Sequence, residues 1–171
     1  PIMADKRVRK VSLTGSTRLG QQMIRDSAAT IKRLSMELGG NAPVIVYADA
    51  DIEKALDLSV ATKFANCGQV CVTGDRFYVH ESLYAQFVEG FARRASQLKV
   101  GYGQDEGTQM GPLINAQRPQ AMEAIVADAR QPGGRAVTGG ERSGPHGGHF
   151  LAPAVVAALP DIRAIGGNPY M

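Results

Sequence analysis

The sequence contains no tryptophan and only 2 cysteines in 171 residues. Two cysteines are too few for the disulfide framework of a small secreted protein, so we expect a cytoplasmic setting. The sequence also has no apolar run approaching the roughly 20 residues of a membrane-spanning helix, and no segment typical of a signal peptide. We therefore expect no membrane partner.

Neither sign of charge predominates in the sequence. The chain has 19 lysines and arginines against 16 aspartates and glutamates, and the resulting formal charge of +3 is scattered along it. Binding of nucleic acid needs a concentrated basic face, so we expect no nucleic-acid partner. A hydrophobic content of 44% in a chain of this length is enough for a proper core and is typical of an α/β protein.

The N-terminal part shows a strand–helix–strand pattern. Alternating apolar residues predict a strand over residues 8–13, which ends at a turn around Gly15. Apolar residues at helical spacing from Leu19 through Ile31 predict a helix, and residues 34–38 predict a second strand. Such units build the parallel sheets that bind dinucleotides.

A second strand–helix–strand pattern follows. Residues 42–47 predict a buried strand, in which Pro43 is restricted to the strand start or an edge. We expect Asp49 or Asp51 to cap the next helix by accepting amide protons. Its apolar face is predicted from four residues at helical spacing, Ile52, Leu56, Val60 and Phe64. This helix leads into a loop over residues 66–71.

The remaining elements are expected from similar signals. Ser82 is a candidate cap for a helix whose apolar residues run from Leu83 to Leu98, and residues 100–113 are rich in glycine and irregular. The other expected elements are strands at residues 76–80, 136–138 and 150–159, and a helix at residues 115–130 with Pro119 in its first turn.

Cys71 is the first candidate for chemistry. It ends the run Asn66-Cys67-Gly68-Gln69-Val70-Cys71, in which Gly68 permits a tight turn. A loop cysteine beside amide groups can form a thiolate that attacks a carbonyl carbon, whereas a buried cysteine acts as a small apolar residue. We expect no metal at Cys67, because no second cysteine pair or suitably spaced histidine accompanies it. A protective disulfide with Cys71 stays open.

Two upstream motifs add further candidates. Glu37 lies in Met36-Glu37-Leu38-Gly39-Gly40, and a carboxylate in such a partly apolar setting can deprotonate water. Without these neighbours, a glutamate at a strand end is more commonly a solvated surface group. The run Gly15-Ser16-Thr17-Arg18-Leu19-Gly20 lies between strand and helix, where amides and a hydroxyl can contact a pyrophosphate or the nicotinamide side.

Together, in order and approximate spacing, these three motifs resemble the aldehyde dehydrogenase superfamily. The resemblance covers about residues 8–165 and corresponds to the middle of a longer family chain, so we expect a fragment whose activity is impaired when it stands alone. It implies an α/β fold in which residues 1–39 are the tail of a Rossmann-like NAD(P)-binding domain. Residues 40–171 would then be the first part of the catalytic domain.

The resemblance also implies roles for individual residues. Cys71 would be the nucleophile and Glu37 the general base when a small-molecule aldehyde is oxidised to a carboxylic acid with NAD or NADP. The residues implied to contact the cofactor are Gly15, Ser16, Thr17, Gly20, Leu38 and Gly39. Family members usually form dimers or tetramers, so a homo-oligomer is expected.

Within the superfamily, residues 32–43 and 111–115 look most like succinate-semialdehyde dehydrogenases. Ala65 departs from that pattern, because those enzymes commonly carry an arginine there to pair with the substrate's far carboxylate. A neutral or aromatic aldehyde therefore stays open. Residues 165–171 also lack the family's acidic residue and Phe-Gly-Pro, so the cofactor contact made by that glutamate is not expected here.

Two other functions stay open from the residues alone. A cysteine-dependent esterase or thioesterase could use Cys71 and Glu37 without a cofactor, although no histidine stands near either motif. A non-catalytic assembly module is the second alternative, since exposed surface favours association. Activity towards activated esters without NAD(P) would distinguish the first alternative from a dehydrogenase.

Overall fold

The structure, a computed structural model, describes residues 2–130, 134–144 and 148–157. Its elements in chain order are η1 (Ile2–Ala4), β1 (Lys10–Gly15), α1 (Thr17–Ser27), η2 (Ala28–Thr30), β2 (Arg33–Leu38), β3 (Ala42–Val46), α2 (Ile52–Phe64), η3 (Ala65–Gly68), β4 (Gly74–Val79), α3 (Glu81–Ser96), α4 (Gln117–Arg130), β5 (Arg135–Thr138) and β6 (Val155–Ala157). The described strands form the parallel pairs β1–β2 and β3–β4 and the antiparallel pair β5–β6. The expected α/β class is confirmed.

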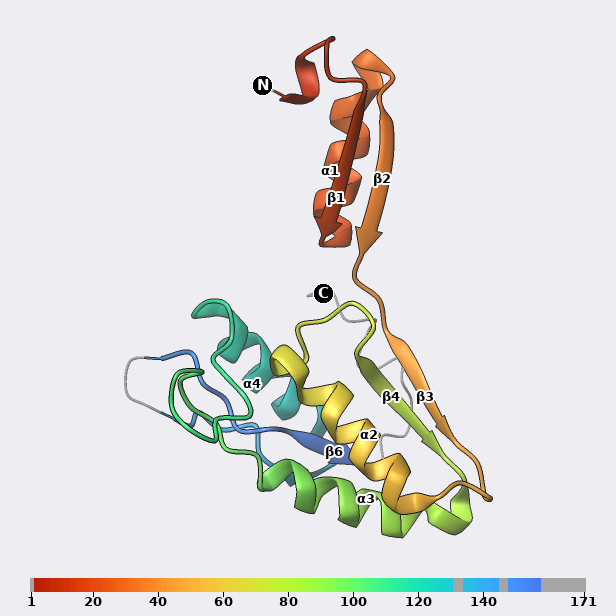
Figure 1. Ribbon diagram of the computed structural model, residues 1–171, viewed down its shortest axis with the longest axis vertical. Coiled ribbons are helices and arrows are strands. Elements are labelled where there is room, and N and C mark those ends of the chain that lie inside the picture. Colours follow the sequence, from red (N-terminus) through yellow and green to blue (C-terminus); the bar gives the residue numbers. More distant parts are fainter. Residues whose placement is uncertain (1, 131–133, 145–147, 158–171) are drawn as a thin grey trace.

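The β1–α1–β2 unit stands apart from the other elements and is joined to them by the chain that follows β2 (Figure 1). The predicted strand–helix–strand order is confirmed, with β1 at Lys10–Gly15 rather than residues 8–13. Ser16 caps α1, because its hydroxyl oxygen accepts a hydrogen bond from the amide of Leu19 at 3.2 Å. The carboxyl ends of β1 and β2 face the second part of the molecule.

The prediction that Ile31 continues the apolar face of α1 is wrong. The helix ends at Ser27, the turn η2 follows, and Ile31 has a φ of 50° with 90% of its surface exposed. Its amide donates to the carbonyl of Ser27 at 2.8 Å while the left-handed backbone redirects the chain into β2. The apolar residues keep their helical spacing in the sequence beyond Ser27, but the chain itself leaves the helix there and turns back.

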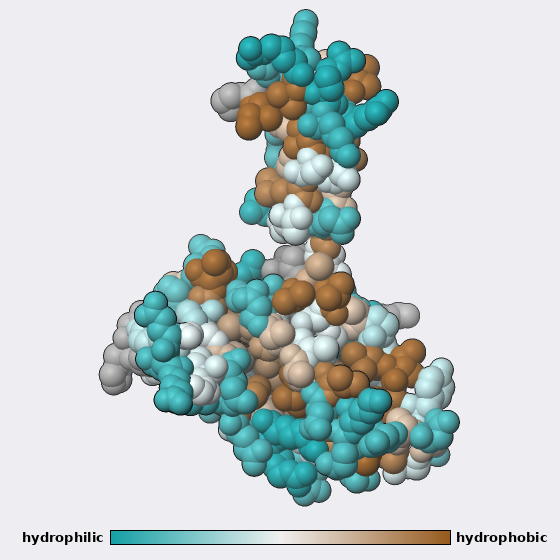
Figure 2. Space-filling view, in the orientation of Figure 1, coloured by the Kyte–Doolittle hydropathy of each residue, from teal (hydrophilic) through white to brown (hydrophobic). Residues whose placement is uncertain are grey.

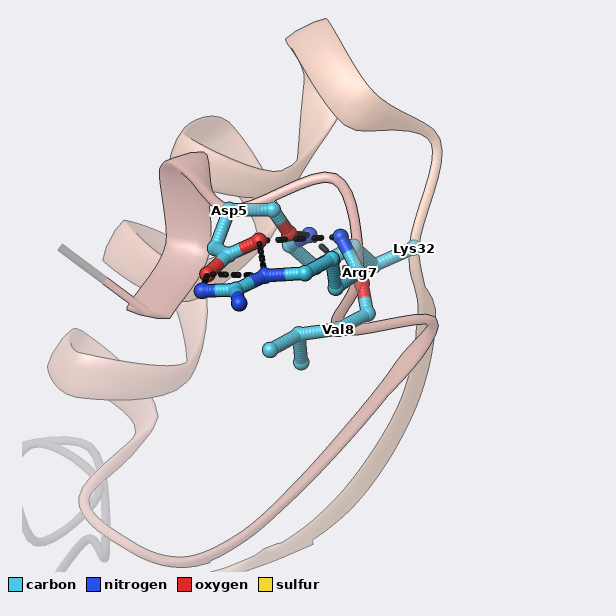
Figure 3. Close-up of polar contacts among 4 residues, drawn as sticks. All are labelled: Asp5, Arg7, Val8 and Lys32. Atoms are coloured by element: carbon cyan, nitrogen blue, oxygen red, sulfur yellow. Dashed lines mark hydrogen bonds and ion pairs between the residues drawn. The ribbon is translucent and has the colours of Figure 1, made fainter.

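Lys32 anchors the start of β2. Although it is only 8% exposed, its ammonium donates to the backbone carbonyls of Asp5 and Val8, each at 2.7 Å (Figure 3). Arg7 pairs with the carboxylate of Asp5 at 2.7 Å in the same segment. Since a buried ammonium needs acceptors, these carbonyls fix the segment before β1 against the beginning of β2.

The second part of the molecule packs helices α2 and α3 on one face of the β3–β4 pair (Figure 1). The predicted apolar face of α2 is confirmed, with Leu56, Val60 and Phe64 in the core and Ile52 packed against it. The strand predicted over residues 42–47 is β3, but its predicted burial holds for one face only: Val44 and Val46 pack towards the helices, whereas Ile45 on the other face is 58% exposed.

Three further predictions are corrected at element ends. His80 rather than Ser82 caps α3, and its Nδ1 accepts from the amide of Ser82 at 3.3 Å. The strand predicted at residues 76–80 is Gly74–Val79. Of the strand predicted at residues 150–159, the structure contains β6 at Val155–Ala157 and an isolated bridge at Leu151; the predicted end lies outside the described residues.

Candidate active site

The loop before Cys71 has an unusual backbone. Three successive residues, Asn66, Cys67 and Gly68, have φ values of 48°, 60° and 73° in the left-handed region. For a residue other than glycine this conformation costs about 1–2 kcal/mol, so contacts outside the loop must hold it. The loop leaves the end of α2 and brings Cys71 to the surface, where it is an exposed free thiol.

Gln69 makes the contacts that hold this loop. Its Nε2 donates to the carbonyl of Asn66 at 3.2 Å, and Asn66 Nδ2 donates to the carbonyl of Gln69 at 3.2 Å. The other side-chain atom, Gln69 Oε1, accepts from the amide of Ile114 at 3.2 Å. Cys67 Sγ donates to the carbonyl of Gly111 at 3.1 Å. The segment 111–114 therefore supports the loop, which sequence reasoning missed.

The two ends of the loop are also tied together. Lys63, near the end of α2, pairs with Asp75 of β4 at 2.6 Å. The buried hydroxyl of Thr73 donates to the carbonyl of Thr62 at 3.0 Å. A Cβ built on Gly68 would lie 3.1 Å from the carbonyl oxygen of Lys63, so the loop turns tightly over the helix end. These contacts fix the distance between the two ends of the loop that carries Cys71.

The two cysteines differ in environment. Cys67 is half-buried, and burial raises the pKa of its thiol. Cys71 is exposed and both thiols are free, so the structure contains no Cys67–Cys71 disulfide. Of the two, Cys71 is the one that a substrate can reach.

Glu37 lies at the carboxyl end of β2, opposite Thr14 of β1. Its side chain is exposed, whereas those of Met36 and Leu38 are half-buried. The partly apolar setting expected for Glu37 is therefore wrong in the structure, because alternation along a strand sends adjacent side chains to opposite faces. Glu37 and Thr14 share the open face at the end of this strand pair.

The turn over Gly15 to Gly20 joins this edge to α1. A Cβ built on buried Gly20 would lie 3.0 Å from both terminal methyl carbons of Leu38, so this glycine lets α1 lie close to β2. Ser16 uses its hydroxyl in the helix cap. The amides of Thr17 and Arg18 have no intrahelical acceptor, as in the first turn of any α-helix.

The chain between β2 and β3 brings the candidates into one region. A Cβ built on Gly40 would lie 3.6 Å from the carbonyl oxygen of Cys71. Glu37 precedes Gly40 by a stretch of chain that extends at most roughly 10 Å. Glu37, half-buried Gly39 and the turn at Gly15 to Gly20 therefore lie at the edge that faces the Cys71 loop (Figure 1).

Two other features are absent from the described residues. No group of three or more histidine, cysteine, aspartate or glutamate side chains there could hold a metal ion. Across the same part of the chain, no helix is both long enough and apolar enough to cross a membrane.

The arrangement of motifs agrees with comparisons to known proteins. A model of the aldehyde dehydrogenase family matches residues 1–166. The chain belongs to this family. The family expected from the sequence is thereby confirmed.

Several relatives of this aldehyde dehydrogenase chain are semialdehyde dehydrogenases. It is 46% identical over 155 residues to a probable succinate-semialdehyde dehydrogenase [NADP(+)] of Sinorhizobium fredii, covering 91% of this chain and 31% of that protein. It is 43% identical over 153 residues to the Escherichia coli succinate-semialdehyde dehydrogenase [NADP(+)] GabD, covering 90% and 32%. The chain thus spans about a third of the length of these relatives.

The structural comparison gives the same extent. A crystal structure of an E. coli NADP-dependent enzyme matches with a TM-score of 0.90 at 40% sequence identity, covering 96% of this chain and 34% of the other. The β1–α1–β2 unit, the Cys71 loop and the helices behind it therefore form a contiguous portion of the family fold.

Proposed function

We propose that this chain carries the nucleophile and the general base of an NAD(P)-dependent dehydrogenase that oxidises an aldehyde, of the semialdehyde type, to a carboxylic acid. One observation carries the proposal. The exposed thiol of Cys71 lies on a braced, left-handed loop beside the linker that follows Glu37, in a chain of the aldehyde dehydrogenase family.

The chemistry divides between the two side chains. The Cys71 thiolate adds to the aldehyde carbon, which gives a thiohemiacetal whose oxyanion the amide of Cys71 helps to hold. A bound nicotinamide would supply the hydride acceptor for this carbon, and Cys71 would then carry the acyl group as a thioester. Glu37 then takes a proton from water, the water oxygen attacks the thioester carbon, and the acid leaves with the thiolate restored.

The residues at the edge of the first unit fit a dinucleotide. Gly15 lacks a side chain at the strand end, and the three atoms nearest to a Cβ placed there would belong to Leu13 and Leu19, at 3.4 Å or more. The amides of Thr17 and Arg18 remain for an anionic group at the start of α1. We propose that Gly15, Ser16 and Thr17 contact NAD or NADP directly, while Gly20 and Leu38 set the spacing of helix and strand beneath them.

Substrate and assembly follow from the relatives. The names of two relatives specify succinate semialdehyde and NADP, and we propose a substrate of that class here. Ala65 is exposed at the start of η3 and supplies no positive charge, so the substrate's carboxylate would need another partner. We further propose that the protein acts in the cytoplasm and as a homo-oligomer.

The test is the reduction of NAD and NADP, followed through the first turnover and into later ones, with succinic semialdehyde, a neutral aliphatic aldehyde and an aromatic aldehyde. Cys71→Ala should abolish reduction, because no carbon–sulfur bond can form. Glu37→Gln should retain the first turnover and block the second, because deacylation needs the base. Glu89→Gln, at an exposed glutamate of α3, is the matched control. Reduction that survives Cys71→Ala would contradict the proposal. No reduction by the folded chain would mean that its motifs are inherited but incomplete, so that the activity belongs to a longer parent protein only.

A further inference from the structure

Arg76 makes a contact that the reaction itself does not explain. This β4 residue donates from Nη2 to the backbone carbonyl of Asn41 at 2.9 Å, and Asn41 belongs to the linker between β2 and β3. Its Nε is buried and has no acceptor among the described residues. A guanidinium donates hydrogen bonds in a rigid, planar geometry. The bond to Asn41 therefore indicates that Arg76 holds the linker in place.

The strand pairing explains why Arg76 reaches the linker. The register of β3 and β4 is regular except at one point, where Ala42 pairs with Gly74 but Pro43 pairs with Arg76, so that Asp75 is skipped. This irregularity sets Arg76 level with the first residues of β3 and on the face away from α2 and α3. From there its guanidinium extends back to the residue before the strand.

Close approach of the two strands reinforces this placement. A Cβ built on Gly74 would lie 2.5 Å from a methyl carbon of Val44, so only glycine lets the strands lie as they do. Gly40 lies against the carbonyl of Cys71, with 3.6 Å between that oxygen and a Cβ built on the glycine. Gly40 thus lies near Cys71, and the next linker residue, Asn41, is bonded to Arg76.

The linker decides where Glu37 lies. The β1–α1–β2 unit is packed within itself and stands apart from the rest of the molecule (Figure 1). Because the chain from Glu37 to Asn41 is short, a linker fixed at Asn41 restricts the positions that the carboxylate can take relative to Cys71. A linker released at Asn41 would let the first unit swing.

We propose that Arg76 is a positioning residue that, by holding the carbonyl of Asn41, sets the distance between Glu37 and Cys71. Its catalytic consequence rests on the proposed function, but the restraint on the linker does not. The attack of Cys71 on the substrate carbon depends only on the geometry of the loop that carries Cys71. Water activation at the thioester requires Glu37 and Cys71 to lie within reach of one substrate, so deacylation depends on the restraint.

The direct test measures the distance between the two parts of the full chain. Spin labels are placed at Arg25→Cys in α1 and Glu89→Cys in α3, both exposed positions, in a Cys67→Ser/Cys71→Ser background. Double electron–electron resonance should give a narrow distance distribution with Arg76 and a broadened one with Arg76→Met. Arg142→Met is the matched control, because it removes an exposed ion pair with Glu123 outside the candidate site.

If Arg76→Met does not fold, the same distance measurement is made on Arg76→Gln. The glutamine side chain keeps a polar group but is too short to reach the carbonyl of Asn41. A distribution as narrow as that of the parent in the folded variant would overturn the proposal. Broadening in the Arg76 variant but not in the control would support it, whether or not the chain oxidises aldehydes. Failure of the proposed function is therefore distinguishable from failure of this inference.

The catalytic readout separates positioning from general damage. With 4-nitrophenyl acetate, the burst reports acylation of Cys71 and the steady state reports deacylation. Arg76→Met should leave the burst rate intact and slow the steady state roughly 10- to 100-fold, as expected for a misplaced base. Arg76→Lys, which keeps a charged donor, should recover part of the loss. Equal slowing of both phases would indicate a structural role and overturn the catalytic part of the proposal.

Discussion

At the scale of single residues, two thiols four positions apart have different environments. Cys67 is half-buried and donates to the carbonyl of Gly111, whereas Cys71 is exposed. The sequence predicted Cys71 as nucleophile from its motif alone. The difference in burial supplies an independent physical reason for the same choice, because a nucleophile must be both accessible and readily ionised.

We therefore predict that iodoacetamide alkylates Cys71 several-fold faster than Cys67 at neutral pH. Burial raises the pKa of Cys67, so at any given pH less of it is thiolate than of an ordinary thiol. Its alkylation should accelerate only at a pH above the range in which an ordinary thiol ionises. The measurement is peptide mass spectrometry of a time course between about pH 6 and 10.

The urea-unfolded chain is the control for this experiment, and there the two cysteines should react at similar rates. Faster alkylation of Cys67 than of Cys71 in the folded chain would show that the burial difference does not govern reactivity.

At the scale of elements, the packing of α2 on α3 depends on a glycine. Buried Gly90 of α3 faces Leu56 of α2, which is 1% exposed. A Cβ built on Gly90 would lie 2.6 Å from one terminal methyl carbon of Leu56 and 3.3 Å from the other. The helices α2 and α3 therefore lie closer than an alanine at position 90 would allow. The Cys71 loop begins at the end of α2, so it is held by this pair.

We predict that Gly90→Ala lowers the free energy of unfolding by up to about 2 kcal/mol. Overpacking costs typically 1–3 kcal/mol, and the better helix propensity of alanine returns about 1 kcal/mol. Urea denaturation followed by circular dichroism measures the change. Gln86→Ala, at an exposed position of the same helix, should alter stability by no more than about 0.5 kcal/mol.

A double-mutant cycle identifies the clash. Leu56→Ala alone should cost about 2–5 kcal/mol, and it should cost less when combined with Gly90→Ala, because the new methyl group partly fills the cavity. Additive effects of the two substitutions would mean that Leu56 and Gly90 do not limit the approach of the helices.

At the scale of the whole molecule, the outer face of β3–β4 exposes large apolar and aromatic side chains: Ile45, Tyr47 and Tyr78 are 58%, 67% and 45% exposed. Figure 2 shows hydrophobic residues, in brown, on the surface of the part of the molecule that holds β3 and β4. Ile45 and Tyr78 are paired across the two strands. Parallel strands are usually covered on both faces, so this surface favours association.

We predict that the chain self-associates with rising concentration and binds a hydrophobic dye through this face. Ile45→Thr combined with Tyr78→Thr should lower both signals, because it removes the paired apolar side chains while keeping residues suited to strands. Sedimentation velocity and dye fluorescence measure the two effects. Leu58→Gln, at a 57% exposed position on α2, is the control; equal effects of both variants would contradict a role for this face.

The sequence by itself determined the parts of the molecule that depend on neighbouring residues. Both strand–helix–strand units and the apolar face of α2 followed from periodicity, and capping chemistry limited the cap of α2 to Asp49 or Asp51, of which the structure uses Asp51. The order of the motifs likewise predicted the family, which the comparison confirmed. The cap at His80 was missed because a histidine nitrogen is a less common cap than the serine two residues later.

Only the tertiary structure decided how the candidate site is held. The left-handed backbone at Asn66 and Cys67 is supported by a contact from Gln69 to Ile114, far along the chain. The position of Glu37 depends on which face of β2 is covered by α1, and the linker depends on the bond from Arg76 to Asn41. Such contacts join segments that local propensity treats as independent, so their geometry emerges only when the chain packs.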